Sequence, residues 1–320
     1  MKYAIGVDLG GTNIAVGIVD GARREIVHKE SIKTRAPRPC KEIAQDICDL
    51  SRAVCEHYGI ALSEVAWVGV GTPGIVKDGV VLTASNLGWN NDPLGEYIKE
   101  GLKVPCYVGN DANVAAFAEA VWGSGHGDPS LVAITLGTGV GGGIVINGKI
   151  WDGFNGFAAE IGHMVIRAEG RECPCGKRGC LETEVSGWAA HREFISKLKQ
   201  GSISMLSKQF KAGNTITLND ILDVLAKEDM LAIEVMEKIG SSLGRAIAGL
   251  INLFNPEVVV LAGTLASAKD YLMHPMKSAI TKYALNFVSK DTSIKVSKLG
   301  EQAGLIGICA ITRNRMLGLH

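Results

Sequence analysis

The feature that most constrains the fold of this chain is a short internal repeat, in which two apolar strands flank a glycine-rich turn. At an offset of 127 residues, Leu9 aligns with Leu136 and Gly10 aligns with Gly137. Each copy continues with a second strand pattern and a turn of one polar residue and glycine. A match this short also arises by chance, but the shared positions are those that a turn requires. We therefore interpret the repeat as two related halves, each presenting one turn.

The glycines of these turns suggest what the turns bind. Glycine makes up 40 of the 320 residues, about twice its usual share. Without side chains, successive backbone N–H groups can approach an anion closely, and Thr12 and Thr138 add hydroxyl donors. One such turn alone is more typical of an ordinary hairpin, whereas two at equivalent positions favour the phosphates of one nucleotide. The chain lacks the sequence pattern of a P-loop, and residues 8–13 do not form the strand-then-helix G-x-G-x-x-G of a Rossmann dinucleotide site.

Strand and helix signals alternate along the chain, which predicts an α/β protein with buried sheets. Apolar residues at helical spacing indicate an amphipathic helix over 40–57, and an apolar run indicates a strand over 65–70. Further strands are expected at 3–7, 14–19, 104–108, 131–136, 140–146 and 258–261, and further helices at 92–101, at 111–122, over most of 183–254 and from about 302.

Composition and charge exclude several classes of partner. The 33 basic residues balance the 33 acidic ones, which argues against nucleic acid or an anionic membrane as a main partner. No apolar stretch reaches the length of a membrane span, and Asp8 interrupts the first apolar segment, so an export signal is not expected. Five scattered cysteines are typical of buried reduced thiols. We therefore expect a cytoplasmic protein.

Two aspartates stand at strand ends, where catalytic groups are often placed. Asp8 lies beside the first turn and could hold Mg²⁺ through water, although a turn-capping role fits equally well. Asp111 follows Asn110 at the end of a strand and the beginning of a helix. Either residue could cap that helix, and Asp111 could act as the base that accepts a hydroxyl proton in phosphoryl transfer. The two roles are compatible, because a base at a helix start is held rigidly.

A cluster of cysteines suggests a metal site. His163, Cys173, Cys175 and Cys180 supply one imidazole and three thiolates, a full tetrahedral set for structural Zn²⁺. The alternatives are three coincidental thiols or a redox pair. A bound metal would order this loop and link folding to zinc. It would also aim the acidic residues on the flanks of the loop, Glu160 and Glu182. The phosphate turns are expected not to depend on the loop.

Taken together, these motifs resemble those of the ROK family (repressor, open reading frame, kinase), in its bacterial glucokinase branch. The resemblance covers nearly the whole chain, and its most specific element is the run from Cys173 to Glu182, Cys-Pro-Cys-Gly-Lys-Arg-Gly-Cys-Leu-Glu. No motif position departs from the family pattern. The other matching segments are 8–13, 71–74, 85–89, 109–113, 136–142 and 160–163.

The resemblance implies an actin-like ATPase fold (ribonuclease H-like) with two α/β domains around a cleft, a small one over 1–110 and a large one over 111–301 that contains the zinc-binding loop. It also implies that the helix over about 302–320 packs back on the small domain. It implies ATP-dependent phosphorylation of a hexose at its 6-hydroxyl, glucose being the first expectation, with Asp111 as the base, Mg²⁺ beside the nucleotide and structural Zn²⁺ in the cysteine loop. The residues implied to contact the sugar are Gly71, Asn86, Asn110, Asp111, Glu160, His163 and Glu182. Those implied for the nucleotide are Asp8, Gly10, Gly11, Thr12, Asn13, Gly137, Thr138, Gly139, Gly141, Gly142 and Gly263.

Three alternatives remain open at this point. Kinases of N-acetylmannosamine, fructose or allose share these motifs. A sugar-responsive transcriptional repressor of the same family would carry a winged-helix region ahead of the first strand, and with that strand starting at Tyr3 none is expected. A non-catalytic actin-like nucleotide-binding protein would need neither Asp111 nor a zinc loop. The resemblance also implies a homo-oligomer, with a dimer favoured.

Overall fold

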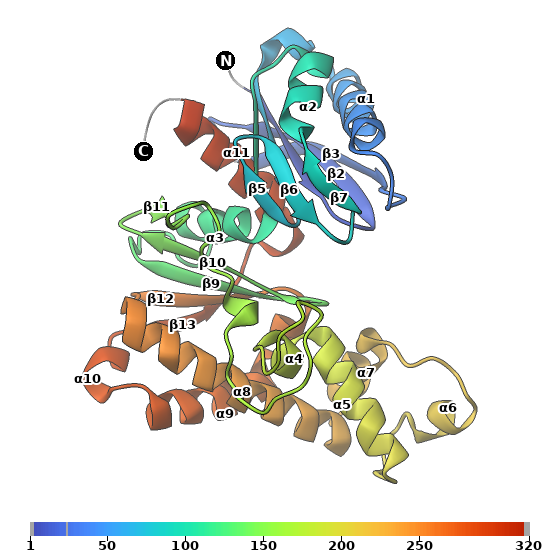
Figure 1. The fold of residues 1–320 in the computed structure, drawn as a ribbon, viewed down its shortest axis with the longest axis vertical. Helices are drawn as coiled ribbons and strands as arrows, with labels where there is room; N and C mark the ends of the chain where they lie inside the picture. The colour runs from blue at the N-terminus through green and yellow to red at the C-terminus, as the bar shows by residue number, and fades with distance from the viewer. Residues whose placement is uncertain (1–2, 24, 317–320) are drawn as a thin grey trace. The chain divides into compact units, whose positions relative to one another are not determined.

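The computed structural model describes residues 3–23 and 25–316, and its internal contacts divide it into two compact units (Figure 1). The first unit comprises the chain up to Pro129, Gly143–Ala159 and the segment from Lys298 onward. The second comprises Ser130–Gly142 and Glu160–Ser297. The first unit extends past residue 110, because helices α3 and α11 pack against each other within it, and the chain returns to this unit at Lys298. Residues 317–320 of the expected last helix lie outside the described residues.

A five-stranded sheet in the order β3-β2-β1-β4-β8 forms the centre of the first unit. Strand β1 is antiparallel to β2 and parallel to β4, which is in turn parallel to β8. The carboxyl ends of β1, β4 and β8 therefore meet at one edge of the sheet, the edge at which α/β proteins usually bind ligands. The strands are β1 (Tyr3–Leu9), β2 (Asn13–Asp20), β3 (Glu25–Lys33), β4 (Val65–Thr72) and β8 (Cys106–Asn110).

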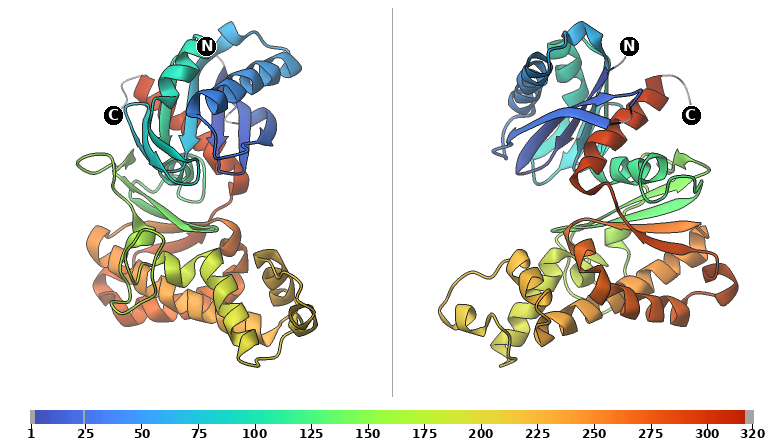
Figure 2. Two further views of the ribbon diagram at one scale, coloured as in Figure 1. Left: turned by 45° about the vertical axis from the view of Figure 1, so that its right-hand side comes forward. Right: turned by 180° about the vertical axis from the view of Figure 1, so that it is seen from behind.

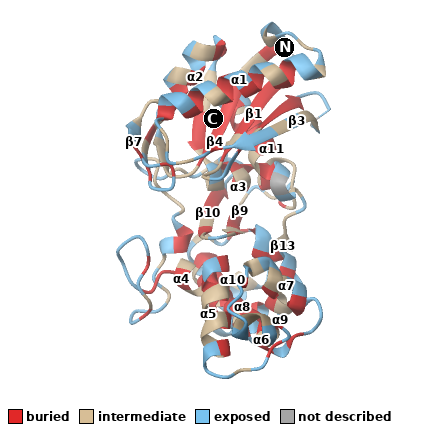
Figure 3. Cartoon of the chain, turned by 90° about the vertical axis from the view of Figure 1, so that its right-hand side faces the viewer, coloured by how far each residue is buried: buried red, intermediate tan, exposed pale blue. Residues whose placement is uncertain are grey.

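Helices cover both faces of this sheet (Figure 2). Helices α1 (Cys40–Tyr58) and α2 (Leu94–Leu102) pack on one face, and α11 (Ala303–Met316) packs on the other, with α3 (Asp111–Val121) beside it. Helix α1 buries Ile43, Ile47 and Val54, the spacing of a single helical face, and it ends at Gly59 in the left-handed conformation. Figure 3 shows how buried residues are concentrated on the strands that these helices cover.

A second, three-stranded sheet of the first unit was not predicted. It is antiparallel in the order β5-β6-β7, formed by β5 (Ile75–Lys77), β6 (Val80–Ala84) and β7 (Trp89–Asp92). These strands are short and their residues are mostly half-buried or exposed, so no clear apolar alternation marks them. The turn between β6 and β7 carries Asn86, one of the residues predicted to contact the sugar.

The other five-stranded sheet of the structure has the order β11-β10-β9-β12-β13. All five residues of β12 are buried, and β12 is parallel to both β9 and β13. Helices α8 and α9 pack closely together and lie on one side of this sheet (Figure 1). The elements concerned are β9 (Leu131–Leu136), β10 (Val140–Ile146), β11 (Lys149–Ile150), β12 (Val258–Ala262), β13 (Ser293–Val296), α8 (Met230–Phe254) and α9 (Lys269–Tyr283).

The two sheets repeat one arrangement, as the internal repeat predicted. In each, the strand before the glycine turn lies between the strand after that turn and a parallel strand from later in the chain.

Within residues 3–23 and 25–316, no helix is long and apolar enough to cross a membrane. The remaining elements are η1 (Leu62–Glu64), η2 (Ile161–His163), α4 (Glu182–Val185), α5 (Gly187–Lys199), α6 (Ser207–Lys211), α7 (Leu218–Leu225), η3 (Thr264–Ala268), α10 (Asn286–Ser289) and η4 (Gly300–Gln302).

Candidate active site

The first glycine turn joins β1 to β2 and presents free backbone donors. The N–H of Gly10 donates to the carbonyl of Asn13 at 2.9 Å. Buried Thr34 holds the turn from behind, because its hydroxyl donates to the Gly10 carbonyl at 2.6 Å and its N–H donates to the Thr12 carbonyl at 2.9 Å. Within the described chain, the N–H groups of Gly11 and Thr12 have no hydrogen-bond partner. The turn thus has the form of an anion-binding nest.

Asp8 lies beside this turn, half-buried near the end of β1. Helix α11 begins next to it, so that a Cβ on Gly304 would lie 3.0 Å from Oδ2 of Asp8. Burial, and to a lesser extent repulsion from the carboxylate of Asp111, together raise the pKa of Asp8 to about 6. A cation bound near both carboxylates would relieve that repulsion, which makes Asp8 a candidate to hold Mg²⁺.

Helix α3 begins at the carboxyl end of β8, and its cap is Asn110 rather than Asp111. Oδ1 of Asn110 accepts hydrogen bonds from the N–H groups of Ala112 and Asn113 at 3.0 and 3.1 Å. Its Nδ2 donates to the carbonyl of Gly74 at 2.9 Å, which leaves one amide hydrogen for a ligand. Of the two residues expected to cap this helix, Asn110 is therefore the cap, and Asp111 is the first residue of the helix itself.

The fold holds the carboxylate of Asp111 in place but does not occupy all of its hydrogen-bonding capacity. Its Oδ1 accepts the N–H of Ala112 at 2.8 Å, and the residue keeps an exposed surface. The protein mass around the carboxylate raises the pKa of Asp111 above its ordinary value, against the lowering effect of the Ala112 hydrogen bond. A raised carboxylate pKa strengthens the group as a proton acceptor.

Two predicted sugar-contacting residues lie near the same sheet edge. Asn86 is exposed, and a Cβ on Gly11 would lie 3.5 Å from its Nδ2, so Asn86 borders the first turn. Gly71 is buried on β4 directly opposite Asp8 in the sheet register. The first unit thus gathers a phosphate-type turn, two carboxylates and two amides along one edge of its sheet.

The second turn joins β9 to β10 and is supported by a helix start. The N–H of Gly137 donates to the carbonyl of Gly139 at 3.0 Å. The carbonyl of Gly137 accepts the N–H of Gly187, the first residue of α5, at 2.8 Å. As in the first turn, two N–H groups, those of Thr138 and Gly139, lack a hydrogen-bond partner among the residues that the structure describes.

Glycine is required next to this turn at the end of β12. Gly263 has φ 87°, and a Cβ there would lie 2.6 Å from the carbonyl oxygen of Leu136. The end of β12 therefore reaches the residue that precedes the second turn. Gly141 and Gly142 lie beyond the turn, within β10, and a Cβ on Gly142 would lie 2.5 Å from Cδ1 of Ile161. The missing side chain of Gly142 thus makes room for η2.

Glu182 joins the second turn to the cysteine loop. Its Oε2 accepts the N–H of Val140 at 2.9 Å, and a Cβ on Gly139 would lie 2.5 Å from the same oxygen. Its Oε1 lies 4.0 Å from Sγ of Cys173. The expectation that the phosphate turns are independent of this loop is therefore wrong for the second turn, which the loop supports directly.

The structure brings the four predicted zinc ligands together. The ligand atoms of His163, Cys173, Cys175 and Cys180 all lie within 4.8 Å of one another. Sγ of Cys173 is 3.7 Å from Nδ1 of His163, and the Sγ atoms of Cys175 and Cys180 are 3.7 Å apart. A tetrahedral Zn²⁺ with ordinary bond lengths needs ligand edges of about 3.6 Å for N···S and about 3.8 Å for S···S. The donor set therefore fits zinc in both chemistry and size.

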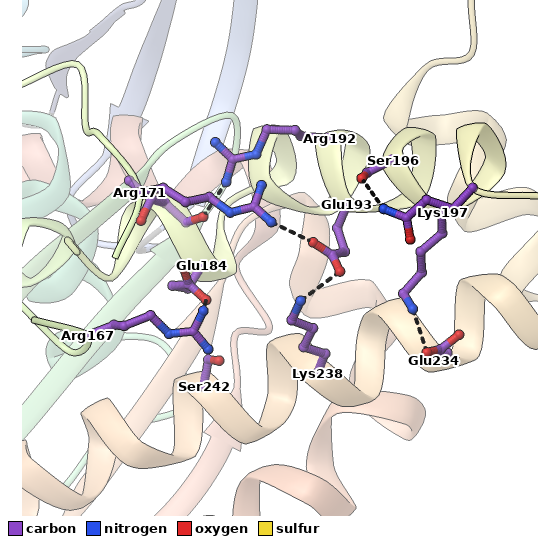
Figure 4. Close-up of polar contacts among 12 residues, drawn as sticks. Arg167, Arg171, Glu184, Arg192, Glu193, Ser196, Lys197, Glu234, Lys238 and Ser242 are labelled. Carbon is purple, nitrogen blue, oxygen red and sulfur yellow. Dashed lines mark hydrogen bonds and ion pairs between the residues drawn. The ribbon is translucent and has the colours of Figure 1, made fainter. Parts of the chain in front are cut away.

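Charged contacts fasten this loop to the helices of the second unit (Figure 4). Arg171 of the loop pairs with Glu193 of α5 at 2.9 Å, and Glu193 also pairs with Lys238 of α8 at 2.6 Å. Arg167 lies 3.8 Å from Glu184 of α4. Although burial raises the pKa of Glu193, Lys238 and Arg171 together hold it below its ordinary value. Sequence reasoning missed this network, because its members are separated along the chain and belong to no motif.

A cavity of about 960 Å³ lies in the first unit but contains little of the predicted site. Asn110 and Asn113 line one part of it, and Tyr107 and Arg315 line another. Asn110 is the one predicted site residue in its lining. The turns, the carboxylates and the cysteine loop are thus defined by backbone geometry and side-chain contacts, not by this cavity.

Comparisons with known proteins extend this description to nearly the whole chain. The family model described as "ROK family" matches residues 4–315. A glucokinase of Halalkalibacterium halodurans is 37% identical over 96% of this chain and 93% of its own length. The xylose repressor of Bacillus subtilis is 25% identical over 99% of this chain and 78% of its own length.

A solved structure agrees with the architecture. It is a ROK family glucokinase from Streptomyces griseus in complex with glucose and AMPPNP, 30% identical, with a TM-score of 0.83, covering 98% of this chain and 99% of that one. The fold is accordingly the actin-like ATPase fold that the sequence predicted. With a family model that spans residues 4–315 and a relative 37% identical over almost its full length, this chain belongs to the ROK family.

Proposed function

We propose that this protein is an ATP-dependent glucokinase that phosphorylates glucose at its 6-hydroxyl. The observation that carries the kinase activity is Asp111, an available carboxylate of raised pKa fixed at the start of α3 by the Asn110 cap. The choice of glucose is supported by the relatives named glucokinase. The experiment that tests it is an ATP-dependent phosphorylation assay over glucose, mannose, fructose, allose and N-acetylmannosamine. Glucose is expected to give the highest kcat/KM.

The proposed reaction is an in-line transfer of the γ-phosphoryl group. As the glucose 6-oxygen forms its bond to the γ-phosphorus, the bond from that phosphorus to the β,γ-bridging oxygen breaks and ADP leaves. The proton of the 6-hydroxyl passes to the carboxylate of Asp111. The rigid start of α3 keeps this carboxylate in place, and positioning of this kind supplies much of the rate in phosphoryl transfer.

The two glycine turns are proposed to bind the phosphates. Each presents two free N–H groups, and such groups stabilise anionic oxygens. Asp8 would hold Mg²⁺ through water, and when bound this ion would supply positive charge against the phosphate oxygens. Gly263 places the end of β12 beside the second turn, consistent with a position near the adenosine.

The sugar hydroxyls are proposed to be bound by the polar groups that the family resemblance names. A site built of hydrogen-bonding groups discriminates strongly between sugars, because a missing hydroxyl leaves its partner unpaired. With Nδ1 of His163 facing the thiols, Nε2 is the nitrogen that would face a hydroxyl. The proposed contacts are Gly71, Asn86, Asn110, Asp111, Glu160, His163 and Glu182.

The cysteine loop is proposed to bind one structural Zn²⁺ through His163, Cys173, Cys175 and Cys180. Four protein ligands leave no open position for water, so the ion would hold the loop and take no part in the chemistry. Through this loop it would position His163 and Glu182. Elemental analysis of the purified protein is the direct measurement, with one zinc per chain expected.

A sugar-responsive repressor is the second candidate function, favoured by the likeness to the xylose repressor. The sugar panel separates the two, because a repressor without kinase activity would bind sugar and turn over no ATP.

We also propose a cytoplasmic homodimer. Large exposed apolar side chains on α8 and near α10, namely Leu253, Leu285 and Phe287, support self-association. Light scattering of the purified protein would measure its mass in solution.

A further inference from the structure

A second group of metal-ligating side chains lies in the first unit, and it shares no residue with either turn or with the cysteine loop. It consists of His28, Glu30 and His57, whose ligand atoms all lie within 4.8 Å of one another. Oε1 of Glu30 is 2.9 Å from Nε2 of His28 and 2.6 Å from Nδ1 of His57. Among the described residues, these three and the cysteine loop are the two groupings of this kind.

The fold holds these three side chains on one face. His28 and Glu30 are two residues apart on β3, where alternate side chains point the same way, and they lie opposite Ile18 and Val16. His57 stands in the last turn of α1, which packs on β3. The ring of His28 stacks on the ring of Tyr58 at 6.3 Å. Two distant segments thus present two imidazoles and one carboxylate to one point.

We propose that His28, Glu30 and His57 form a second metal site that binds a divalent transition cation of the Zn²⁺ class. Two histidines and one carboxylate are an established ligand set for such ions, with water completing the shell. A tetrahedral ion needs N···O edges of about 3.4 Å, so the Glu30 oxygen must move outward by somewhat more than half an ångström. The side chains are 29–58% exposed, which leaves room for this movement and for water ligands. The bound ion would tie edge strand β3 to the end of α1.

The test uses Co²⁺ as a spectroscopic probe on the full-length protein at pH 8, with Zn²⁺ titrations alongside. Cobalt held by thiolates shows a sulfur-to-metal charge-transfer band, whereas cobalt held by histidine and carboxylate does not. We expect two equivalents per chain, one with this band and one without it. His57→Gln and Glu30→Gln should each weaken the equivalent without the band by at least tenfold and leave the other intact. His126→Gln, at an exposed loop histidine, is the matched control and should retain both.

Each outcome bears on the proposal separately from the zinc loop. An absent thiolate band would count against the cysteine site alone. Wild-type protein that binds no ion outside the cysteine loop would overturn the second site. So would His57→Gln and Glu30→Gln proteins that bind the second equivalent as tightly as wild type. In that case the three side chains form only the hydrogen-bonded pairs that Glu30 makes with each histidine.

Discussion

The two glycine turns occupy equivalent places in two similarly ordered sheets, yet their surroundings differ. In each turn the N–H of the first glycine donates a hydrogen bond across the turn, and two further N–H groups are free. The first turn has a carboxylate, Asp8, on its leading strand, and repulsion from Asp111 reaches that carboxylate. The second has Thr135 at the position that matches Asp8, and it is supported by α5 and by Glu182.

This difference shows how one repeated arrangement can serve two tasks. The shared backbone supplies anion donors in both halves, while the neighbouring side chains decide what else each half does. Acidic groups near the first turn suit a cation and a proton acceptor. The support of the second turn by the cysteine loop couples it to the proposed sugar contacts His163 and Glu182. Six substitutions test this division of roles.

The largest effect is expected for Asp111→Asn, which removes the proposed base from the first half only. The Asn110 cap is untouched, and an asparagine at position 111 can still accept the Ala112 N–H, so the fold should persist. We expect kcat to fall by at least ~10², the usual cost of losing a general base. ATP and glucose dissociation constants should change little. Steady-state kinetics and calorimetry provide the measurements, and Asp223→Asn, at an exposed carboxylate of α7, is the control. Near-normal turnover in the folded variant would refute the assignment.

Substitutions in the turns themselves should show the next largest effect. Gly11→Val and Gly137→Val both have room for a side chain, since a Cβ on Gly137 meets nothing within 4 Å and one on Gly11 meets only ordinary contacts. The branched side chain would occupy the space in front of the free N–H groups. We expect ATP affinity to weaken by roughly tenfold or more, which corresponds to about 1.4 kcal/mol, with glucose affinity affected less.

A third glycine makes this comparison sharper. Gly139→Val would press on Glu182, because a Cβ there lies 2.5 Å from its Oε2. This variant should therefore weaken both ATP and glucose binding, unlike Gly137→Val. Calorimetry with each ligand separates the two patterns. If ATP affinity is unchanged in all three variants, the turns are plain hairpins.

The sequence predicted most of this comparison, because the turns and the cysteine loop are local patterns. Each of these patterns can be recognised within a few residues. Examples are the glycine runs, the buried strand over 258–261 and the spacing of Cys173, Cys175 and Cys180. The features it missed depend on distant segments. Thr34 supports the first turn through a hydrogen bond to Gly10, which is 24 residues away along the chain. Glu182 accepts a hydrogen bond from Val140, which is 42 residues away. Only the folded chain shows such pairs.

Local chemistry also left some assignments open. Asn110 and Asp111 are both good capping residues, and only the backbone at the start of α3 shows which of them caps. The strands β5, β6 and β7 lack clear alternation, so periodicity could not reveal them. The extent of the first unit beyond residue 110 could not be read from local patterns, because the packing of α3 on α11 joins segments almost 200 residues apart.

A smaller effect is expected for Cys175→Ser, which weakens the support of the second turn. The protein should lose its zinc, and the KM for glucose should rise about tenfold, a typical result of disturbing residues around a site. Because Glu182 contacts Val140, the affinity for ATP should also fall, though by less. Zinc content and kinetics measure this, with Cys106→Ser, outside the loop, as the control. A fully active variant that retains its metal would contradict the ligand assignment.

The smallest effect concerns the stability cost of the carboxylate at the first turn. Burial and Asp111 raise the pKa of Asp8 to about 6 from an ordinary 3.8. The folded chain therefore holds a proton that the unfolded chain releases between about pH 4 and 6, and stability is lost as the pH rises through this window. Asp8→Asn removes the effect, so the variant should gain stability over wild type as the pH increases. Between pH 5 and pH 8 the gain should grow by about 1 kcal/mol. Urea unfolding at the two pH values measures it. If the unfolding free energies of Asp8→Asn and wild type differ equally at both pH values, Asp8 ionises normally. A stability gain that grows with pH, together with lost activity, would show that this carboxylate serves function and destabilises the fold.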